Sequence, residues 1–260
     1  MTFTSKYRIF YIGIISSVPI ALYISYINDL WFWFLASFIY VKFLNFFALQ
    51  IGLHRYFTHR SFETTRTMHY ALSFSSVLTG QGSPITWATH HIHHHKHSDS
   101  DLDVHSPIHG FWHTCFFWAI KSYKYFNQEK RIMPTPKHLI RDKTVMYIHK
   151  NYFFIWTCLI LLSFIIDWKF CLFFVLMPAG MSVLHGNIVT NFLSHTKLPG
   201  SYRNFETRDK SWNNKFIQLF QGGEGLHNNH HHNSIKYNQA MKPGEFDLAA
   251  VVIDKFLIQK

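Results

Sequence analysis

The residues most able to do chemistry in this sequence are its histidines, which number 20 in 260 residues and gather in clusters. Two short clusters, at 90–95 and 227–232, contain histidines spaced three and four positions apart. Residues with this spacing share one face of a helix, whereas adjacent histidines diverge by about 100° because a turn takes about 3.6 residues. Each cluster can therefore present imidazoles to two metal ions a few ångströms apart.

Together with histidines near the ends of apolar segments, the two clusters supply nine imidazoles. The set is His54, His59, His91, His94, His95, His195, His227, His230 and His231. A zinc ion takes about four ligands, so nine imidazoles indicate a site for two metals. Imidazole nitrogen favours iron, copper, zinc or nickel over magnesium or calcium.

Spacing alone leaves two features of this set open. The cluster at 90–95 fits the spacing in two frames, which are His90, His93 and His94, or His91, His94 and His95. His54 and His59 are five positions apart, about 140° on a regular helix, so they lie at a helix end, on a distorted turn or on opposite metals. A surface tract that binds metals nonspecifically is the alternative for 90–95.

Four apolar runs must position these histidines. They cover approximately 9–27, 30–53, 147–166 and 170–191. Each is about 20 residues long, the length that crosses a bilayer core of about 30 Å. The short separations at 28–29 and 167–169 predict two transmembrane hairpins. A signal peptide is the alternative for the first run, but no small-residue cleavage site follows it; four buried helices of a soluble protein are the other alternative.

The charged residues predict the orientation of these spans. The sequence has 25 Lys and Arg against 14 Asp and Glu, a formal net charge of +11. Apart from Lys42 and Lys169, the basic residues lie at or beyond the span ends that share one side with the N-terminus. By the positive-inside rule this side is cytoplasmic. We therefore expect a multi-pass protein, in a bacterial inner membrane, with both termini in the cytoplasm.

The expected fold is an all-α integral membrane protein, one domain over 1–260, in which a cytoplasmic helical cap holds the metal site. The cap comprises 54–146 and 192–260. Within it, Met68–Trp87 and Ile108–Ile120 are rich in aromatic residues and are expected to lie in the membrane interface.

Composition excludes several other classes of protein. Aromatic residues make up 18% and charged residues 15% of the chain, against about 25% charged in ordinary soluble domains. This argues against disorder and coiled coils. Three cysteines without a CxxC spacing imply no disulfide framework. A metal transporter would need ionisable groups within its spans, whereas nearly all histidines lie outside them. Nucleic acid is not expected as a partner, because the basic residues follow membrane topology.

Four segments resemble the membrane fatty acid desaturase family, most of all the acyl-CoA delta-9 branch and its short bacterial members. They are Gly52–His59, Trp87–Lys96 with Ser98, Asp99, Asp103 and His105, Asn191–His195, and Gly223–His231. The joint pattern HxxxxH, HxxHH, NxxxH and HxxHH is highly specific, although any one box is not.

The resemblance selects one frame for the cluster at 90–95. The family has Lys or Arg, any residue, then Ser directly after its second box, which matches Lys96 and Ser98. It implies that His91, His94 and His95 are metal ligands, with the other six histidines of the set. His90, His93 and His232 are then extra, and Asn191 falls on a position that reaches a metal through water.

The resemblance also implies the chemistry. Two iron ions would use O2 and two electrons to remove hydrogen from two adjacent CH2 groups of a long-chain fatty acyl substrate. An unactivated C–H bond offers no acidity to a general base, which agrees with a metal-based reaction. Zinc is expected to replace iron readily in purified protein. A related hydroxylase or monooxygenase would use the same metals and spans, and stays the alternative.

Departures from the family leave the acyl carrier open among acyl-CoA, acyl-carrier protein and acyl lipid. Animal acyl-CoA desaturases have an Arg-Asp pair where this sequence has Thr89 and His90, and a Trp where it has Ile188. Val104 stands where the family usually has Pro. No fused electron-transfer domain fits in 260 residues, so we expect a separate donor, a ferredoxin or a cytochrome b5 type with a reductase.

The first spans are expected to line a tunnel for the acyl chain. Lys42 lies about three turns before His54 and therefore inside the bilayer. It contacts this tunnel, or it is a lysine that extends to the interface or pairs with a neighbouring helix.

Overall fold

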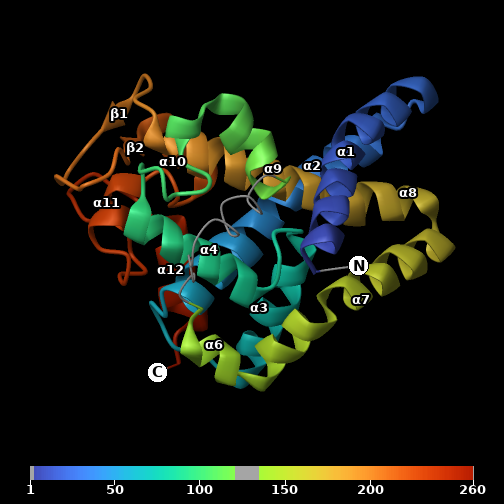
Figure 1. Cartoon of the computed structure of the whole chain (residues 1–260), viewed down its shortest axis with the longest axis horizontal. Coiled ribbons are helices and arrows are strands. Elements are labelled where there is room, and N and C mark those ends of the chain that lie inside the picture. The colour runs from blue at the N-terminus through green and yellow to red at the C-terminus, as the bar shows by residue number, and fades with distance from the viewer. Residues whose placement is uncertain (1–2, 121–134, 260) are drawn as a thin grey trace.

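The structure is a computed structural model that describes residues 3–120 and 135–259 (Figure 1). Among these residues, four helices are long and apolar enough to cross a membrane. They are Ser5–Asn28, Trp31–Thr58, Lys143–Ile166 and Trp168–His195. This confirms the predicted all-α membrane fold with two helical hairpins. The second and fourth helices extend beyond the expected 30–53 and 170–191, so both carry a predicted site histidine.

The spans are built from consecutive helical elements. The first span is α1 (Phe3–Asn28) and the third is α7 (Lys143–Ile166). The second begins as α2 (Trp31–Leu44) and continues as the π-helix η1 (Asn45–Thr58). The fourth runs without a gap through α8 (Trp168–Phe170), η4 (Cys171–Leu176), α9 (Met177–His185), η5 (Gly186–Phe192) and η6 (Leu193–His195).

Aspartates close the hairpins and begin the helices. Asp29 links α1 to α2 with a positive φ of 53°, a conformation that Asp tolerates better than most residues. The Asp167 carboxylate accepts a hydrogen bond from the backbone N–H of Lys169 at 2.7 Å. Asp142 caps α7 in the same way, because its carboxylate accepts from the N–H groups of Thr144 and Val145. Each cap satisfies N–H groups that lack a partner within the helix.

The outer faces of the spans are apolar. The side chains of Phe32, Ile39 and Ile165 are 80%, 72% and 77% exposed, which suits contact with lipid rather than water. Inside the bundle α1 and α9 approach closely at Gly180, where a Cβ would lie 2.1 Å from the carbonyl oxygen of Ile14. Small residues allow such close approach between membrane helices.

The part of the cap that the structure describes consists of short helices and one pair of strands. Its elements are α3 (Arg66–Leu78), α4 (Pro84–His97), η2 (Pro107–His109), η3 (His113–Phe117), α6 (Lys137–Arg141), α10 (Lys215–Gln221), α11 (His227–His232), α12 (Leu248–Val252) and η7 (Ile253–Leu257). Strands β1 (Ser201–Tyr202) and β2 (Asn213–Asn214) pair antiparallel, Ser201 opposite Asn214. In Figure 1 α4 and α11 lie on the left, far from the hairpin end marked by α8 on the right.

The two segments expected in the membrane interface carry exposed aromatic side chains. Phe74 is 52% exposed on α3, and Trp112 is 66% exposed between η2 and η3. Their position in a bilayer stays a prediction.

The core of the cap joins the end of the second span to the C-terminal segment. Buried apolar side chains from the second span, α3, α4, α12 and η7 form one cluster, which includes Ile51, Phe57, Leu72, Ile85, Ala249, Ile253 and Leu257. The C-terminal segment is thereby fixed against the same helix that carries His54.

A buried ion pair strengthens this junction. Arg55 and Asp247 are 1% and 0% exposed, and Nη1 of Arg55 lies 3.0 Å from Oδ2 of Asp247. Arg55 also donates to the carbonyl oxygen of Tyr237 at 2.7 Å, and Asp247 accepts from the backbone N–H groups of Gln239 and Ala250. Because both charges are buried, removing either one leaves the other buried without its partner.

We expect Asp247→Ala to lower the free energy of unfolding by about 3–5 kcal/mol, because it leaves the Arg55 guanidinium buried and unpaired. Thermal unfolding of the purified protein in detergent measures this. Asp254→Ala is the control, since Asp254 is exposed and its carboxylate accepts from Tyr237 at the surface. Equal unfolding temperatures for the two variants would contradict the role assigned to the ion pair.

Candidate metal centre

The nine predicted histidines come together from four places in the chain. They lie at the end of the second span, on α4, at the end of the fourth span and on α11. Their side-chain nitrogens form two groups, and within each group these atoms all lie within 4.8 Å of one another. The first group is His54, His59, His91, His95 and His230, and the second is His94, His195, His227 and His231.

The π-helical end of the second span explains how His54 and His59 face the same group. The backbone N–H of His59 donates to the carbonyl oxygen of His54 at 3.2 Å, the five-residue step that defines a π-helix. Five residues therefore make about one turn, and the two ring centroids are 5.0 Å apart. Of the three placements that the spacing left open, the structure has the distorted turn.

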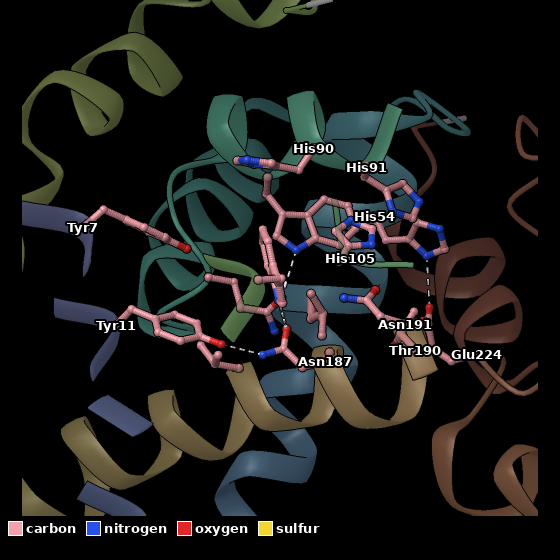
Figure 2. A pocket seen from close by; sticks show the side chains of 16 residues that line it. Tyr7, Tyr11, His54, His90, His91, His105, Asn187, Thr190, Asn191 and Glu224 are labelled. Carbon is pink, nitrogen blue, oxygen red and sulfur yellow. Dashed lines mark hydrogen bonds and ion pairs between the residues drawn. The ribbon is translucent and has the colours of Figure 1, made fainter. Parts of the chain in front are cut away.

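On α4, His91, His94 and His95 point into the groups and their neighbours point elsewhere. Ser83 begins this helix by accepting from the N–H of Thr86, with Pro84 in the first turn. Nδ1 of His90 lies 2.8 Å from the carbonyl oxygen of Thr86, and Nε2 of His93 lies 2.9 Å from that of Leu102. Figure 2 shows His90 leaving α4 in a different direction from His91.

Distances between ring nitrogens in the groups suit metal ligation. In the first group the Nε2 atoms of His54 and His230 are 2.9 Å apart, and those of His230 and His95 are 2.8 Å apart. In the second, Nε2 of His227 lies 3.0 Å from that of His195. Two nitrogens bound to one ion at about 2.1 Å and at right angles would lie about 3.0 Å apart. The donor set and its spacing therefore fit two metal ions.

Four carboxylates hold the opposite nitrogen of four of these rings. Nδ1 lies 3.0 Å from a carboxylate oxygen in the pairs His54–Glu224 and His231–Asp209, 2.8 Å in His94–Asp103 and 2.9 Å in His195–Asp99. Because an ionised carboxylate only accepts hydrogen bonds, Nδ1 carries the proton and Nε2 keeps its lone pair. Each carboxylate therefore fixes both the tautomer and the orientation of its ring.

The electrostatic setting keeps most of the rings uncharged. Burial, and then the neighbouring imidazoles, lower the pKa of His59, His91, His95, His227 and His230 well below the usual value. Burial likewise lowers the pKa of His231 to about 4. Burial alone would raise the pKa of Asp209, but the bond from His231 outweighs it and the net shift is downward. Neutral imidazoles beside ionised carboxylates are the form that a metal cation needs.

His94 differs from the other rings. Burial lowers its pKa, but the charge of Asp103 and its hydrogen bond outweigh this, and the net shift is upward. Its neighbour His105 also faces Asp103, at 3.3 Å, and burial lowers the pKa of His105 to about 3. When His94 carries protons on both ring nitrogens, Nε2 must therefore lose its proton before it can bind a metal in the second group.

Sequence reasoning found the imidazoles and missed the role of the carboxylates. Asp99, Asp103 and Glu224 lie in the segments that resemble the family, without an assigned part, and Asp209 was not singled out. Asp209 lies in a loop, 18 residues before His227, where no periodicity marks it. Among the extra histidines, His232 stacks on Phe205 with ring centroids 3.8 Å apart and takes no part in either group.

A cavity of about 60 Å³ reaches the first group of imidazoles. Tyr7 and Tyr11 of the first span line one part, and His54, His91 and Glu224 line the other (Figure 2). Leu49 and Val183 add apolar wall from the second and fourth spans, and Asn191 lines the same cavity. The cavity lies beside the spans, where the tunnel is expected, and Lys42 is not among its lining residues.

Polar groups along this cavity bond to one another. The indole N–H of Trp87 donates to Oε1 of Gln81 at 3.0 Å, and that of Trp118 donates to Oδ1 of Asn187 at 2.8 Å. Nδ2 of Asn187 donates in turn to the hydroxyl of Tyr11 at 2.8 Å. With these groups satisfied, the cavity presents mainly ring faces and aliphatic carbons, which suits an apolar chain.

Comparisons with known proteins agree with this site. A family model described as "Fatty acid desaturase" matches residues 21–240. This chain belongs to the fatty acid desaturase family. The desaturase is 31% identical over 208 residues to the sn-1 stearoyl-lipid 9-desaturase of Anabaena variabilis, an alignment that covers 79% of this chain and 74% of the relative.

Plant relatives differ in the position and carrier that their names give. The desaturase is 31% identical to an acyl-CoA 5-desaturase of Anemone leveillei, over 71% of this chain and 56% of the relative. It is 28% identical to delta-9 acyl-lipid desaturase 2 of Arabidopsis thaliana, over 87% of this chain and 74% of the relative. This desaturase thus spans little more than half the length of the Anemone enzyme.

We expect His95→Ala to lose at least one of two bound metals per chain, and His90→Ala to retain both. His95 contributes a nitrogen to the first group, whereas His90 bonds to the backbone of its own helix. Metal analysis of iron-loaded protein at matched purity measures this. A metal-replete His95→Ala variant beside a metal-depleted His90→Ala variant would show that the other frame of the cluster is the ligand frame.

Proposed function

We propose that this desaturase introduces a double bond at the delta-9 position of a long-chain fatty acyl substrate, with O2 as co-substrate. The observation that carries the proposal is the cavity of apolar character that leads to His54 and His91 of the first imidazole group. An acyl chain in this cavity would bring saturated carbons beside the metal site. Such carbons have no acidic proton, so side chains alone cannot activate them.

Two iron ions are the proposed cofactor, held by the nine histidines of the two groups. Asn191 would contribute through a water molecule. When bound, the irons supply the O2-dependent oxidation that removes two hydrogens from the chain. Zinc would compete for the same sites in purified protein, because the donor set is rich in imidazole.

The chain's own residues would orient the substrate and keep water away. The Trp87 and Trp118 rings are fixed by bonds to Gln81 and Asn187, so the cavity wall is set before the substrate arrives. Small shifts of a substrate relative to reacting groups change rates strongly. The position of the new double bond would therefore depend on how this rigid wall seats the acyl chain.

The proposed substrate is an acyl lipid or an acyl thioester. The names of the Anabaena and Arabidopsis relatives favour an acyl lipid and the delta-9 position, whereas the Anemone relative acts on acyl-CoA at position 5. Thr89 and His90 replace the Arg-Asp pair of animal acyl-CoA enzymes, which agrees with a carrier other than CoA. The two electrons would come from a separate ferredoxin, or from a cytochrome b5 type donor with a reductase.

The proposed location is a bacterial inner membrane, with the cap and both termini in the cytoplasm. The excess of Lys and Arg on the cap side supports this orientation.

Expression in bacterial cells, followed by fatty acid analysis, tests the activity. We expect a new monounsaturated fatty acid with its double bond at carbon 9, absent from cells that carry His94→Ala at matched protein level. A hydroxylated product would reassign the site to hydroxylation. Unchanged lipids in cells that contain metal-loaded protein and a reduced donor would contradict the proposal.

Reporter fusions test the orientation. We expect a cytoplasmic reporter to be active when fused after 259 and a periplasmic reporter to be active in the turns at 29 and 167, because the charge distribution holds the cap in the cytoplasm. A cytoplasmic signal from either turn would reverse the proposed topology.

A further inference from the structure

A second, larger hollow also lies against the second span. It has a volume of about 750 Å³, and its walls come from the second span, α10 and the segment 244–248. The site histidines are absent from its lining, in contrast to the cavity lined by His54 and His91. Its volume lies within the range of known small-molecule pockets, about 300–1,000 Å³.

The floor of this hollow has polar atoms without partners. Asn45 and Gln50 are 4% and 2% exposed. The side-chain oxygens of Asn45, Gln50 and Gln218 are buried and accept no hydrogen bond among the described residues. The Gln50 amide is oriented by its Nε2, which donates to the carbonyl oxygen of Gln221, so its free atom is the acceptor. Buried acceptors without donors are costly, and here three of them line one hollow.

The rim of the hollow carries two basic side chains. Lys42 and Lys215 are both exposed and line it from the second span and from α10. Neither forms an ion pair with a carboxylate in the part of the chain that the structure describes. The carboxylate of Glu245 also lines the hollow, but it accepts hydrogen bonds from Tyr202, Asn204 and Asn229. The hollow therefore offers two lysines without a carboxylate partner, together with free hydrogen-bond acceptors.

The outer surface around the hollow is strongly apolar. On α10 the side chains of Phe216, Leu219 and Phe220 are 60%, 76% and 69% exposed, and Phe246 beside them is 59% exposed. This cap helix packs against the membrane-facing span, because Gly222 at its end lies against the ring of Phe46. A short helix with exposed aromatics beside a transmembrane helix belongs in the membrane interface.

We propose that this hollow binds one glycerophospholipid of the cytoplasmic leaflet that is not the substrate. The phosphate would lie between Lys42 and Lys215, and a head group with N–H or O–H donors would satisfy the three amide oxygens. Its acyl chains would lie on Phe46, Leu219 and Phe220. Phosphatidylethanolamine carries these donors, whereas phosphatidylcholine has the same phosphate and a quaternary nitrogen without N–H.

Such a lipid would stabilise a segment of the chain next to the metal centre. Gln221 and Gly222 line the hollow, and Glu224, two residues later, holds His54. Occupancy of the hollow would therefore stabilise the segment that orients one of the imidazoles.

Native mass spectrometry of the detergent-purified full chain tests the proposal. The protein is delipidated and then given phosphatidylethanolamine or phosphatidylcholine with matched saturated chains. We expect one phosphatidylethanolamine bound per chain, with retention of phosphatidylcholine weaker by about tenfold, the effect of losing a hydrogen bond to a charged group. Equal retention of the two lipids, or retention of neither, would overturn the proposal and leave the amide oxygens to water.

Matched variants separate this site from the lipid-facing surface. Lys215→Glu should reduce phosphatidylethanolamine retention by about tenfold, and Lys236→Glu, an exposed lysine outside the hollow, should not. Gln50→Leu should remove the preference between the two lipids, and Lys42→Met is the second variant if Gln50→Leu does not fold. A bound lipid that becomes unsaturated during turnover would overturn the claim that it is not the substrate, and the activity proposed above would still stand.

Discussion

Nine imidazole rings are packed together in a space that fits two metal ions. This packing is the main constraint on the structure. Six of the nine histidines are buried and the other three are partly buried. The nitrogens of neighbouring rings face one another at about 3 Å. Such a cluster is unfavourable unless cations fill it and acceptors hold the outer nitrogens. The four carboxylates supply those acceptors, and the loops that carry Asp99, Asp103, Asp209 and Glu224 are folded to deliver them.

The four carboxylates explain why the cap and the spans form one unit. Of the four carboxylates, Asp209 and Glu224 come from the last third of the chain, and Glu224 reaches back to His54 on the second span. Arg55, the residue after His54 on the same helix, forms the buried ion pair with Asp247. The end of this span is therefore held by later segments of the chain through two contacts. The hydrogen bond between His54 and Glu224 orients a site histidine, and the ion pair of Arg55 and Asp247 stabilises the fold.

The sequence predicts the spans and the metal-binding residue type well, because both depend on local patterns. Runs of about 20 apolar residues and repeated histidine spacings can be read without knowing what lies nearby. Resemblance to the family selects the frame that uses His91, His94 and His95. In the structure the rings of His90 and His93 contact backbone carbonyl oxygens instead. The contribution of Asp209 could not be predicted in this way, since only the folded loop brings it to His231. The hollow between the second span and α10 likewise depends on packing between segments about 170 residues apart.

The π-helical second half of the second span has a consequence for sequence length. A π-helix closes its hydrogen bonds over five residues instead of four, so the stretch Asn45–Thr58 contains more residues than a regular helix of the same number of turns. If the same residues formed a regular α-helix, they would make more turns and would rotate the earlier part of the span relative to His54. Phe43, now 63% exposed, would then lose its orientation towards lipid. The number of residues in this stretch and its π-helical hydrogen bonding are therefore linked, and a one-residue insertion or deletion keeps both faces of the span in place only if the hydrogen bonding changes with it.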